Sequence, residues 1–176
     1  MQSGCIAECK AAVLPLGVYT NGDMNDFKTT VSKIHKGVCQ TANFEKHALN
    51  NSFYNVKEWI RLIITYEPLR GINSDILSKN LITDFKDENE ALKFRDEFDK
   101  VLILSVSQLD NIQKYTSETN SLYSILKKIK SSNFNDVINS LSDKTGRTFK
   151  DSYLAKYREQ IINNLVTEIK THKRTK

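Results

Sequence analysis

Apolar side chains recur every three or four residues along most of this 176-residue chain, and that spacing constrains its fold more than any other feature. Such a spacing places the apolar residues on one face of an α-helix, because about 3.6 residues make one turn. The chain also has only 6 glycines and 2 prolines, which encodes few turns and disfavours sandwiches and barrels. We therefore predict an all-α fold, a single-domain bundle of about five to seven helices.

The clearest stripe follows Asp23, a residue well suited to cap a helix. Its members are Met24, Phe27, Val31, Ile34 and Val38. Other stripes predict helices over the ranges 6–14, 52–67, 74–85, 133–145 and 150–170. The 52–67 range has a wide apolar face and ends before Pro68, so we expect it to be the most buried helix. Asn133 and Gly146 are suitable residues to begin and end the 133–145 helix.

The last predicted helix is expected to turn its apolar stripe toward the core of the bundle. The stripe consists of Leu154, Tyr157, Ile161, Leu165 and Ile169. A frayed basic tail, 171–176, is expected to follow it.

Residues 88–130 carry two apolar columns that step by seven residues, and no glycine or proline interrupts them. One continuous helix over this range would be about 65 Å long. The alternative is two helices that are broken at Thr116 and Ser117, where Ser117 caps the second. Because Ser105, Gln108 and Thr119 place polar groups in the columns, we expect antiparallel packing within the bundle instead of a dimeric zipper.

The whole chain, 1–176, is predicted to form a single α-helical domain with a partly ordered N-terminal segment, 1–22. No stretch approaches the roughly 18 consecutive apolar residues of a membrane span, so no transmembrane segment is expected. Residues 1–20 lack the basic start and apolar run of a signal peptide. The sequence leaves open whether the protein is cytoplasmic or exported with its leader removed, and it leaves open the oligomeric state.

The net charge of +5 is unevenly distributed along the chain. Residues 75–126 carry 6 basic and 10 acidic side chains, whereas residues 127–176 carry 12 basic and 5 acidic ones. Clustered basic side chains bind phosphates, although they equally form a solvated surface. The candidate contacts to an anionic partner are Lys127, Lys128, Lys130, Lys144, Arg147, Lys150, Lys173, Arg174 and Lys176.

The three cysteines lie in the first quarter of the chain, and their number fits two states. Either they are incidental thiols, or a disulfide joins Cys5 or Cys9 to Cys39 and staples the first two predicted helices. By loop entropy such a bridge would stabilise the fold by about 3–4 kcal/mol. A zinc site is disfavoured, because it requires four ligands at characteristic spacings and the three histidines are scattered.

No motif for catalysis or for a cofactor is present, so we predict no catalytic, cofactor-binding or metal-binding residue and no cofactor. The glycine-rich loops that bind dinucleotides or nucleotide phosphates are missing. We therefore predict a non-enzymatic protein that binds another macromolecule, as an inhibitor, immunity protein, effector or accessory subunit, with a protein as the expected partner. The alternative is a nucleic-acid-binding accessory factor that uses the basic C-terminal third. A third hypothesis is a small helical toxin or nuclease, whose catalytic residues would include His35 or His47.

Overall fold

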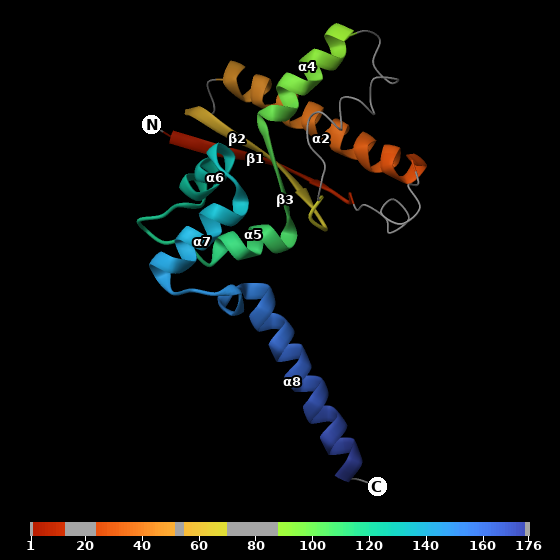
Figure 1. Ribbon diagram of the computed structural model, residues 1–176, viewed down its shortest axis with the longest axis vertical. Helices are drawn as coiled ribbons and strands as arrows, with labels where there is room; N and C mark the ends of the chain where they lie inside the picture. The colour runs from red at the N-terminus through yellow and green to blue at the C-terminus, as the bar shows by residue number, and fades with distance from the viewer. Residues whose placement is uncertain (1, 13–23, 52–54, 70–87, 175–176) are drawn as a thin grey trace. The chain divides into compact units, whose positions relative to one another are not determined.

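The structure is a computed structural model that describes residues 2–12, 24–51, 55–69 and 88–174 (Figure 1). These residues form six α-helices, three β-strands and one short 3-10 helix. In chain order the elements are β1 (Gln2–Lys10), α2 (Met24–Asn50), β2 (Val56–Thr65), α4 (Glu88–Asp99), β3 (Val101–Ser105), α5 (Val106–Gln113), α6 (Leu122–Ser131), α7 (Phe134–Thr145), η2 (Phe149–Asp151) and α8 (Tyr153–Arg174). The fold is therefore mixed α/β, and the all-α prediction was wrong.

The three strands form one parallel sheet in the order β1-β2-β3. The central strand β2 lies in the range that was predicted to be the most buried helix, and β1 occupies most of the predicted 6–14 helix. The burial was correctly predicted, since Ile60, Leu62 and Ile63 are almost fully covered. A strand of a parallel sheet is buried on both faces and reads as a continuous apolar run, which periodicity cannot distinguish from a buried helix.

Neither alternative for residues 88–130 was correct, because this range contains α4, β3, α5 and α6. The run from Val101 to Leu104 pairs with β2 in the sheet. Ser105 then starts α5 through a capping box with Gln108. The Ser105 backbone N–H donates to Gln108 Oε1 at 2.9 Å, and the Gln108 N–H donates to Ser105 Oγ at 3.2 Å. Ser105 and Gln108, which were predicted to lie in the seven-residue columns of a helix, therefore lie at the junction of β3 and α5.

The stripe after Asp23 does form a helix, and it is the buried face of α2. Val31, Ile34 and Val38 are fully covered where α2 packs against β1 and β2. The helix approaches β2 closely at Gly37, where a Cβ atom would lie 3.1 Å from Ile63 Cδ1. Phe94 and Phe98 of α4 complete the same apolar cluster. The core of this part of the chain therefore lies between the sheet and helices α2 and α4.

The chain divides into two compact units, residues 1–108 (unit 1) and residues 109–176 (unit 2), and each is described by itself. Unit 1 contains the sheet, α2 and α4. Residues 13–22 of the segment predicted to be partly ordered, and the predicted 74–85 helix, lie outside the described residues. In unit 2 the prediction for 133–145 is confirmed by α7, whose cap Asn133 accepts a hydrogen bond from the Asp136 N–H at 2.9 Å. Gly146 ends α7 with a left-handed φ of 66°.

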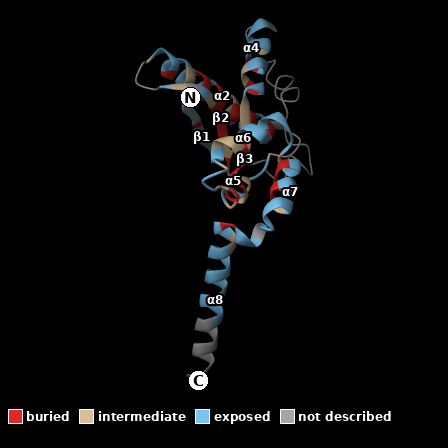
Figure 2. Cartoon of the chain, turned by 90° about the vertical axis from the view of Figure 1, so that its left-hand side faces the viewer, coloured by how far each residue is buried: buried red, intermediate tan, exposed pale blue. Residues whose placement is uncertain are grey.

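The last helix is also confirmed, but its predicted inward face was wrong. Leu154, Tyr157, Ile161 and Leu165 of α8 are all exposed, and the side chain of Ile169 lies outside the described residues. Figure 2 shows the contrast between the exposed surface of α8 and the buried residues of the strands and α2. Within unit 2, the described residues do not cover this face.

The side chain of Arg61 is 2% exposed and carries its charge into the core of unit 1. Its Nη1 lies 2.6 Å from Glu97 Oε2, and its Nη2 donates to the Glu97 carbonyl oxygen at 2.6 Å. Its Nε lies 3.6 Å from Glu45 Oε2, which is an ion pair without a hydrogen bond. Arg61 therefore connects the central strand to both α4 and α2.

We expect Glu97→Gln to lower the free energy of unfolding at pH 7 by about 2–4 kcal/mol, because it leaves the buried Arg61 charge poorly compensated. Asp96→Asn, an exposed neighbour on the same helix, is the matched control and should change it by less than about 0.5 kcal/mol. Urea unfolding measures both variants. Equal stability of Glu97→Gln and the wild type would contradict the role given to this ion pair.

The same variant has a defined pH dependence. Burial alone would raise the pKa of Glu97, but hydrogen bonds from Lys100 and Arg61 and their positive charges outweigh it, so this pKa is lowered. The ion pair therefore stabilises the fold fully above the pKa of Glu97 in the unfolded chain, near 4.3. This stabilisation is lost as the pH falls through the lower pKa of Glu97 in the folded chain. The difference in the free energy of unfolding between the wild type and Glu97→Gln should become smaller below about pH 4. A difference that stays constant on acidification would rule out this assignment.

Candidate functional site

The predicted basic residues lie on separate parts of unit 2. Lys127, Lys128 and Lys130 are exposed on α6, and Lys144 is exposed at the end of α7. Arg147 and Lys150 follow Gly146 and are exposed too. The side chains of Lys173 and Arg174 on α8, and all of Lys176, lie outside the described residues. Of this set, only Arg147 lines a described pocket.

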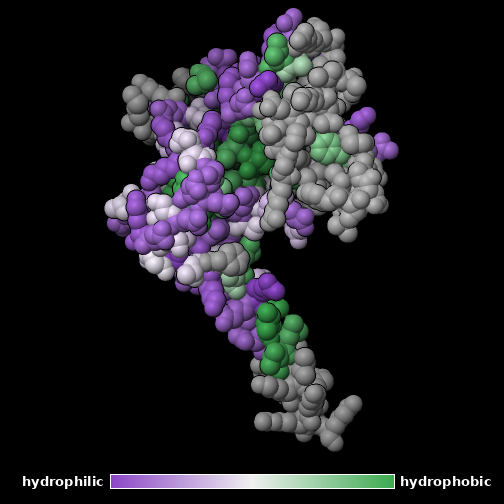
Figure 3. All heavy atoms as spheres, in the orientation of Figure 1, coloured by the Kyte–Doolittle hydropathy of each residue, from purple (hydrophilic) through white to green (hydrophobic). Residues whose placement is uncertain are grey.

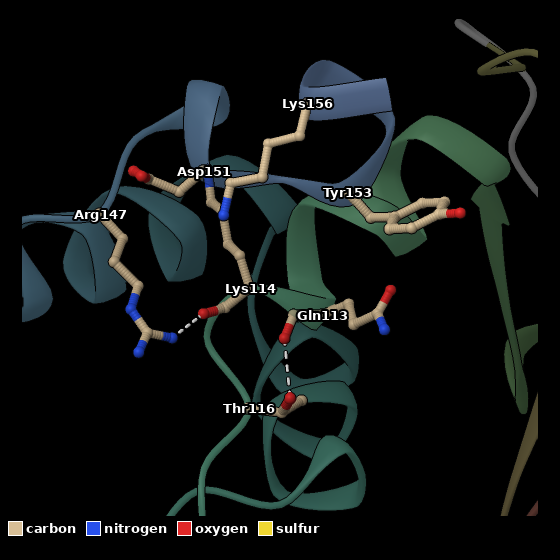
Figure 4. A pocket seen from close by; sticks show the side chains of 7 residues that line it. All are labelled: Gln113, Lys114, Thr116, Arg147, Asp151, Tyr153 and Lys156. Atoms are coloured by element: carbon tan, nitrogen blue, oxygen red, sulfur yellow. Dashed lines mark hydrogen bonds between the residues drawn. The ribbon is translucent and has the colours of Figure 1, made fainter. Parts of the chain in front are cut away.

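That pocket, which we call the cationic pocket, has a volume of about 430 Å³ and lies entirely within unit 2 (Figure 4). It is lined by Gln113, Lys114, Thr116, Arg147, Asp151, Tyr153 and Lys156. In Figure 4 the lysine side chains lie between the Arg147 guanidinium on one side and the Tyr153 ring on the other. The fold thus brings three cations and an aromatic ring together from three segments of the chain. Lys114, Lys156 and Tyr153 were not identified from the sequence.

Backbone hydrogen bonds hold Arg147 at the pocket. The Arg147 guanidinium donates to the Lys114 carbonyl oxygen. The Arg147 carbonyl oxygen in turn accepts from the Ser142 hydroxyl at 2.8 Å and from the Tyr115 hydroxyl at 3.3 Å. The segment after α7 is therefore fixed to the end of α5, and this is why two cations 33 residues apart share one pocket.

The start of α8 is fixed by a buried carboxylate. Asp110 of α5 is buried, and its Oδ1 accepts a hydrogen bond from the Leu154 backbone N–H at 3.2 Å. The Ala155 N–H donates to Ser152 Oγ at 3.3 Å, so Ser152 caps the same helix end. These two contacts satisfy N–H groups that a helix N-terminus otherwise leaves without partners. They also hold Tyr153 beside Gln113 at the edge of the pocket.

Asp151 contributes one negative charge to the cationic pocket. The hydrogen bond from the Thr148 backbone N–H, at 2.6 Å, is the main reason that the pKa of Asp151 is lowered. Slight burial opposes this effect, while the Thr148 hydroxyl and the charges of Lys156 and Lys114 add to it. The carboxylate is therefore ionised at neutral pH, but it balances only one of the three positive charges in the pocket. The pocket keeps an excess of positive charge.

Two tyrosines extend from the pocket along the first turns of α8. The Tyr153 and Tyr157 rings are nearly parallel, with an interplanar angle of 4° and ring centroids 6.2 Å apart. Both rings are exposed, and Tyr153 is 67% exposed. The fold therefore presents an open aromatic face beside a cationic pocket.

The rest of α8 carries a second feature, which we call the α8 apolar face. Its members are Leu154, Tyr157, Ile161, Ile162, Leu165 and Val166, each between 39% and 52% exposed. Figure 3 shows apolar residues gathered on this helix. Large contiguous apolar patches on a surface mark interaction sites, whereas single exposed apolar residues are normal. Within the described ranges, each helix is too short or too polar to cross a bilayer.

Unit 1 has a polar cluster at the carboxyl end of β1, the edge where parallel sheets bind ligands. Lys10 Nζ lies 2.7 Å from Glu8 Oε1 and also donates to Gln40 Oε1 of α2. Glu8 is a single carboxylate and is already paired with Lys10. No group of three or more metal-binding side chains occurs in the described parts of the chain. We therefore interpret this cluster as a tie between β1 and α2.

The thiols and two of the histidines lie in unit 1. All three cysteines are free and exposed, so the predicted disulfide of Cys5 or Cys9 with Cys39 is not formed here and stays a prediction. Cys39 Sγ lies 3.6 Å from His35 Nε2. His47 Nε2 instead lies 3.0 Å from the side-chain amide of Asn51. Neither histidine lines a described pocket.

A second pocket of unit 2, of about 510 Å³, lies between the end of α5 and the start of α6. It is lined by Leu109, Gln113, Thr116, Ser117, Ser121 and Leu122. None of these side chains is charged, and the pocket offers hydroxyl groups, the amide of Gln113 and apolar contacts. It therefore indicates no particular ligand.

No protein-family model, curated protein or solved structure matches the chain.

Cys5 and Cys39 should react slowly with alkylating reagents at neutral pH. Their side chains are exposed, but neighbouring protein atoms partly shield the sulfur from water, and this partial desolvation raises the pKa of both thiols. The charge of Glu97 raises the pKa of Cys39 further, so less of each thiol is ionised than in an unfolded chain. Iodoacetamide labelling over a pH series, followed by mass spectrometry of each peptide, measures the apparent pKa. Glu97→Gln should lower the value for Cys39 and leave that for Cys5 unchanged. Equal profiles in folded and urea-unfolded protein would contradict this expectation.

If the α8 apolar face serves binding and not folding, a charge placed on it should cost little stability. Ile161→Asp should lower the free energy of unfolding by less than about 1 kcal/mol. This small loss includes the effect of the lower helix propensity of aspartate. Ile125→Asp, at a fully buried position of α6, should lower it by more than about 3 kcal/mol. Urea unfolding compares the two. A large loss from Ile161→Asp would show that the face packs against the chain itself.

Proposed function

We propose that this chain is a non-enzymatic interaction protein that binds a partner protein through the α8 apolar face. The observation that carries the proposal is the exposure of this face from Leu154 to Val166, within a helix of 22 residues. Most helices in proteins are stabilised by packing of their apolar side. A partner that covers the face would supply that packing.

The expected partner presents an apolar groove with an acidic rim. An amphipathic helix binds such a groove through apolar anchors spaced by three or four residues, as Leu154, Tyr157, Ile161 and Leu165 are. The sequence of α8 contains five basic and two acidic residues, so acidic groups at the rim would complement it. The same positive charge disfavours pairing of two copies of α8 with each other.

A photoreactive residue placed at position 161, and in a control protein at position 163 on the polar side of α8, tests the proposal in native lysate. Position 161 should give one dominant crosslinked protein, and position 163 should give much less of it. The partner, once identified and purified, should bind the wild type and Asn163→Asp with similar Kd. Ile161→Asp with Leu165→Asp should weaken it at least about 100-fold, since two apolar anchors are lost.

Two results would refute the proposal. One is binding of the purified partner by Ile161→Asp with Leu165→Asp as tightly as by the wild type. The other is recovery of no protein partner at low salt, together with binding of the wild type, but not of the double variant, to anionic vesicles. That result would assign the α8 apolar face to a lipid surface.

A further inference from the structure

We propose that the cationic pocket of unit 2 binds single-stranded nucleic acid, with phosphates held by Lys114, Arg147 and Lys156 and a base stacked on Tyr153. This site goes beyond the proposed protein-binding function and does not depend on it. Of its residues only Tyr153 and Lys156 lie on α8, and both are near its start, whereas the anchors Ile161 and Leu165 lie further along the helix.

Charge indicates an anionic ligand. The pocket gathers three cations around the single carboxylate of Asp151, and the lysine charges are close enough to lower the pKa of that carboxylate. Three cations with one counter-charge repel one another, and a bound anion relieves that repulsion. Arg147 uses one guanidinium N–H for the Lys114 carbonyl oxygen, which leaves its other donors for a ligand. A phosphate accepts several such donors.

The aromatic residues indicate what the anion is attached to. A free phosphate would gain nothing from an exposed aromatic ring beside the cations. Tyr153 lines the pocket with a largely exposed ring, and Tyr157 lies parallel to it on the next turn of α8. Nucleic-acid bases stack on such rings, and proteins that bind single strands combine aromatic stacking with a cationic path for the backbone.

The arrangement favours a single strand over a duplex. In a duplex the bases are stacked on one another, and their faces are not available to a protein side chain. A pocket of about 430 Å³ accepts the phosphates and sugar of a short stretch of one strand. The contacts to phosphate are independent of sequence, so we expect little base preference.

Fluorescence anisotropy with the full-length chain and a labelled oligothymidylate of about 12 nucleotides tests the site. Lys114→Gln with Lys156→Gln should weaken binding at least about 10-fold and reduce the slope of log affinity against log salt by about 1.4, because two phosphate contacts are lost. Lys128→Gln with Lys144→Gln removes the same charge from unit 2 outside the pocket and should change affinity less than about 2-fold. Circular dichroism confirms that each variant is folded.

Stacking is tested separately. Tyr153→Ala should weaken binding about 5- to 100-fold, whereas Tyr153→Phe, which keeps the ring, should remain within about 2-fold of the wild type. A duplex of the same length and a thymidine mononucleotide are the comparison ligands, and both should bind at least about 10-fold more weakly than the single strand.

Four results would overturn the proposal. The first is that the wild type does not bind the oligonucleotide at low salt, and the second is that the two double lysine variants lose the same affinity. The third is that a duplex binds as tightly as the single strand while Tyr153→Ala binds as tightly as the wild type. The fourth is that the mononucleotide binds as tightly as the oligonucleotide. The second and third would indicate a diffuse charged surface, and the fourth a pocket for a small nucleotide. None of them bears on binding through Ile161 and Leu165, so the two proposals can fail separately.

Discussion

The fold of unit 1 depends on how the charge of Arg61 is accommodated in the middle of β2. A guanidinium removed from water is costly unless its hydrogen bonds are made and its charge is balanced. Arg61 meets this requirement with groups from two helices, the side chain and backbone of Glu97 and the carboxylate of Glu45. The apolar cluster would tolerate small shifts of α2 and α4 over the sheet. The directional contacts of Arg61 allow far fewer, so they select one arrangement of those helices.

The sequence predicted those helices whose signals are local. The stripe of α2, the cap and the glycine that bound α7, and the pattern of α8 all act within a few residues of each other. The strands were missed because pairing in a parallel sheet joins distant segments, such as Cys5 with Ile60 and Leu62 with Leu102. The range 60–64, which is apolar except for Arg61, fits the buried face of a helix as well as a strand. The capping box of Ser105 and Gln108 was the local signal that could have separated α5 from β3.

The candidate site was only partly predictable for a related reason. Arg147 belongs to a group of basic residues that are close in the sequence, and it was predicted for that reason. The other two cations of the pocket, Lys114 and Lys156, come from the end of α5 and from the start of α8. No spacing in the sequence links Lys114 to Lys156, and only the packing of unit 2 brings them together. For α8 the error was one of interpretation. We predicted that the apolar stripe packs in the core of the bundle, whereas its described side chains are exposed in the structure.

The hydrogen bond from the Leu154 N–H to Asp110 joins residues that are 44 positions apart. It closes a loop of the chain that contains both α6 and α7. The start of α8 is thereby held at the helix from which that loop begins, while the apolar side chains further along α8 stay exposed.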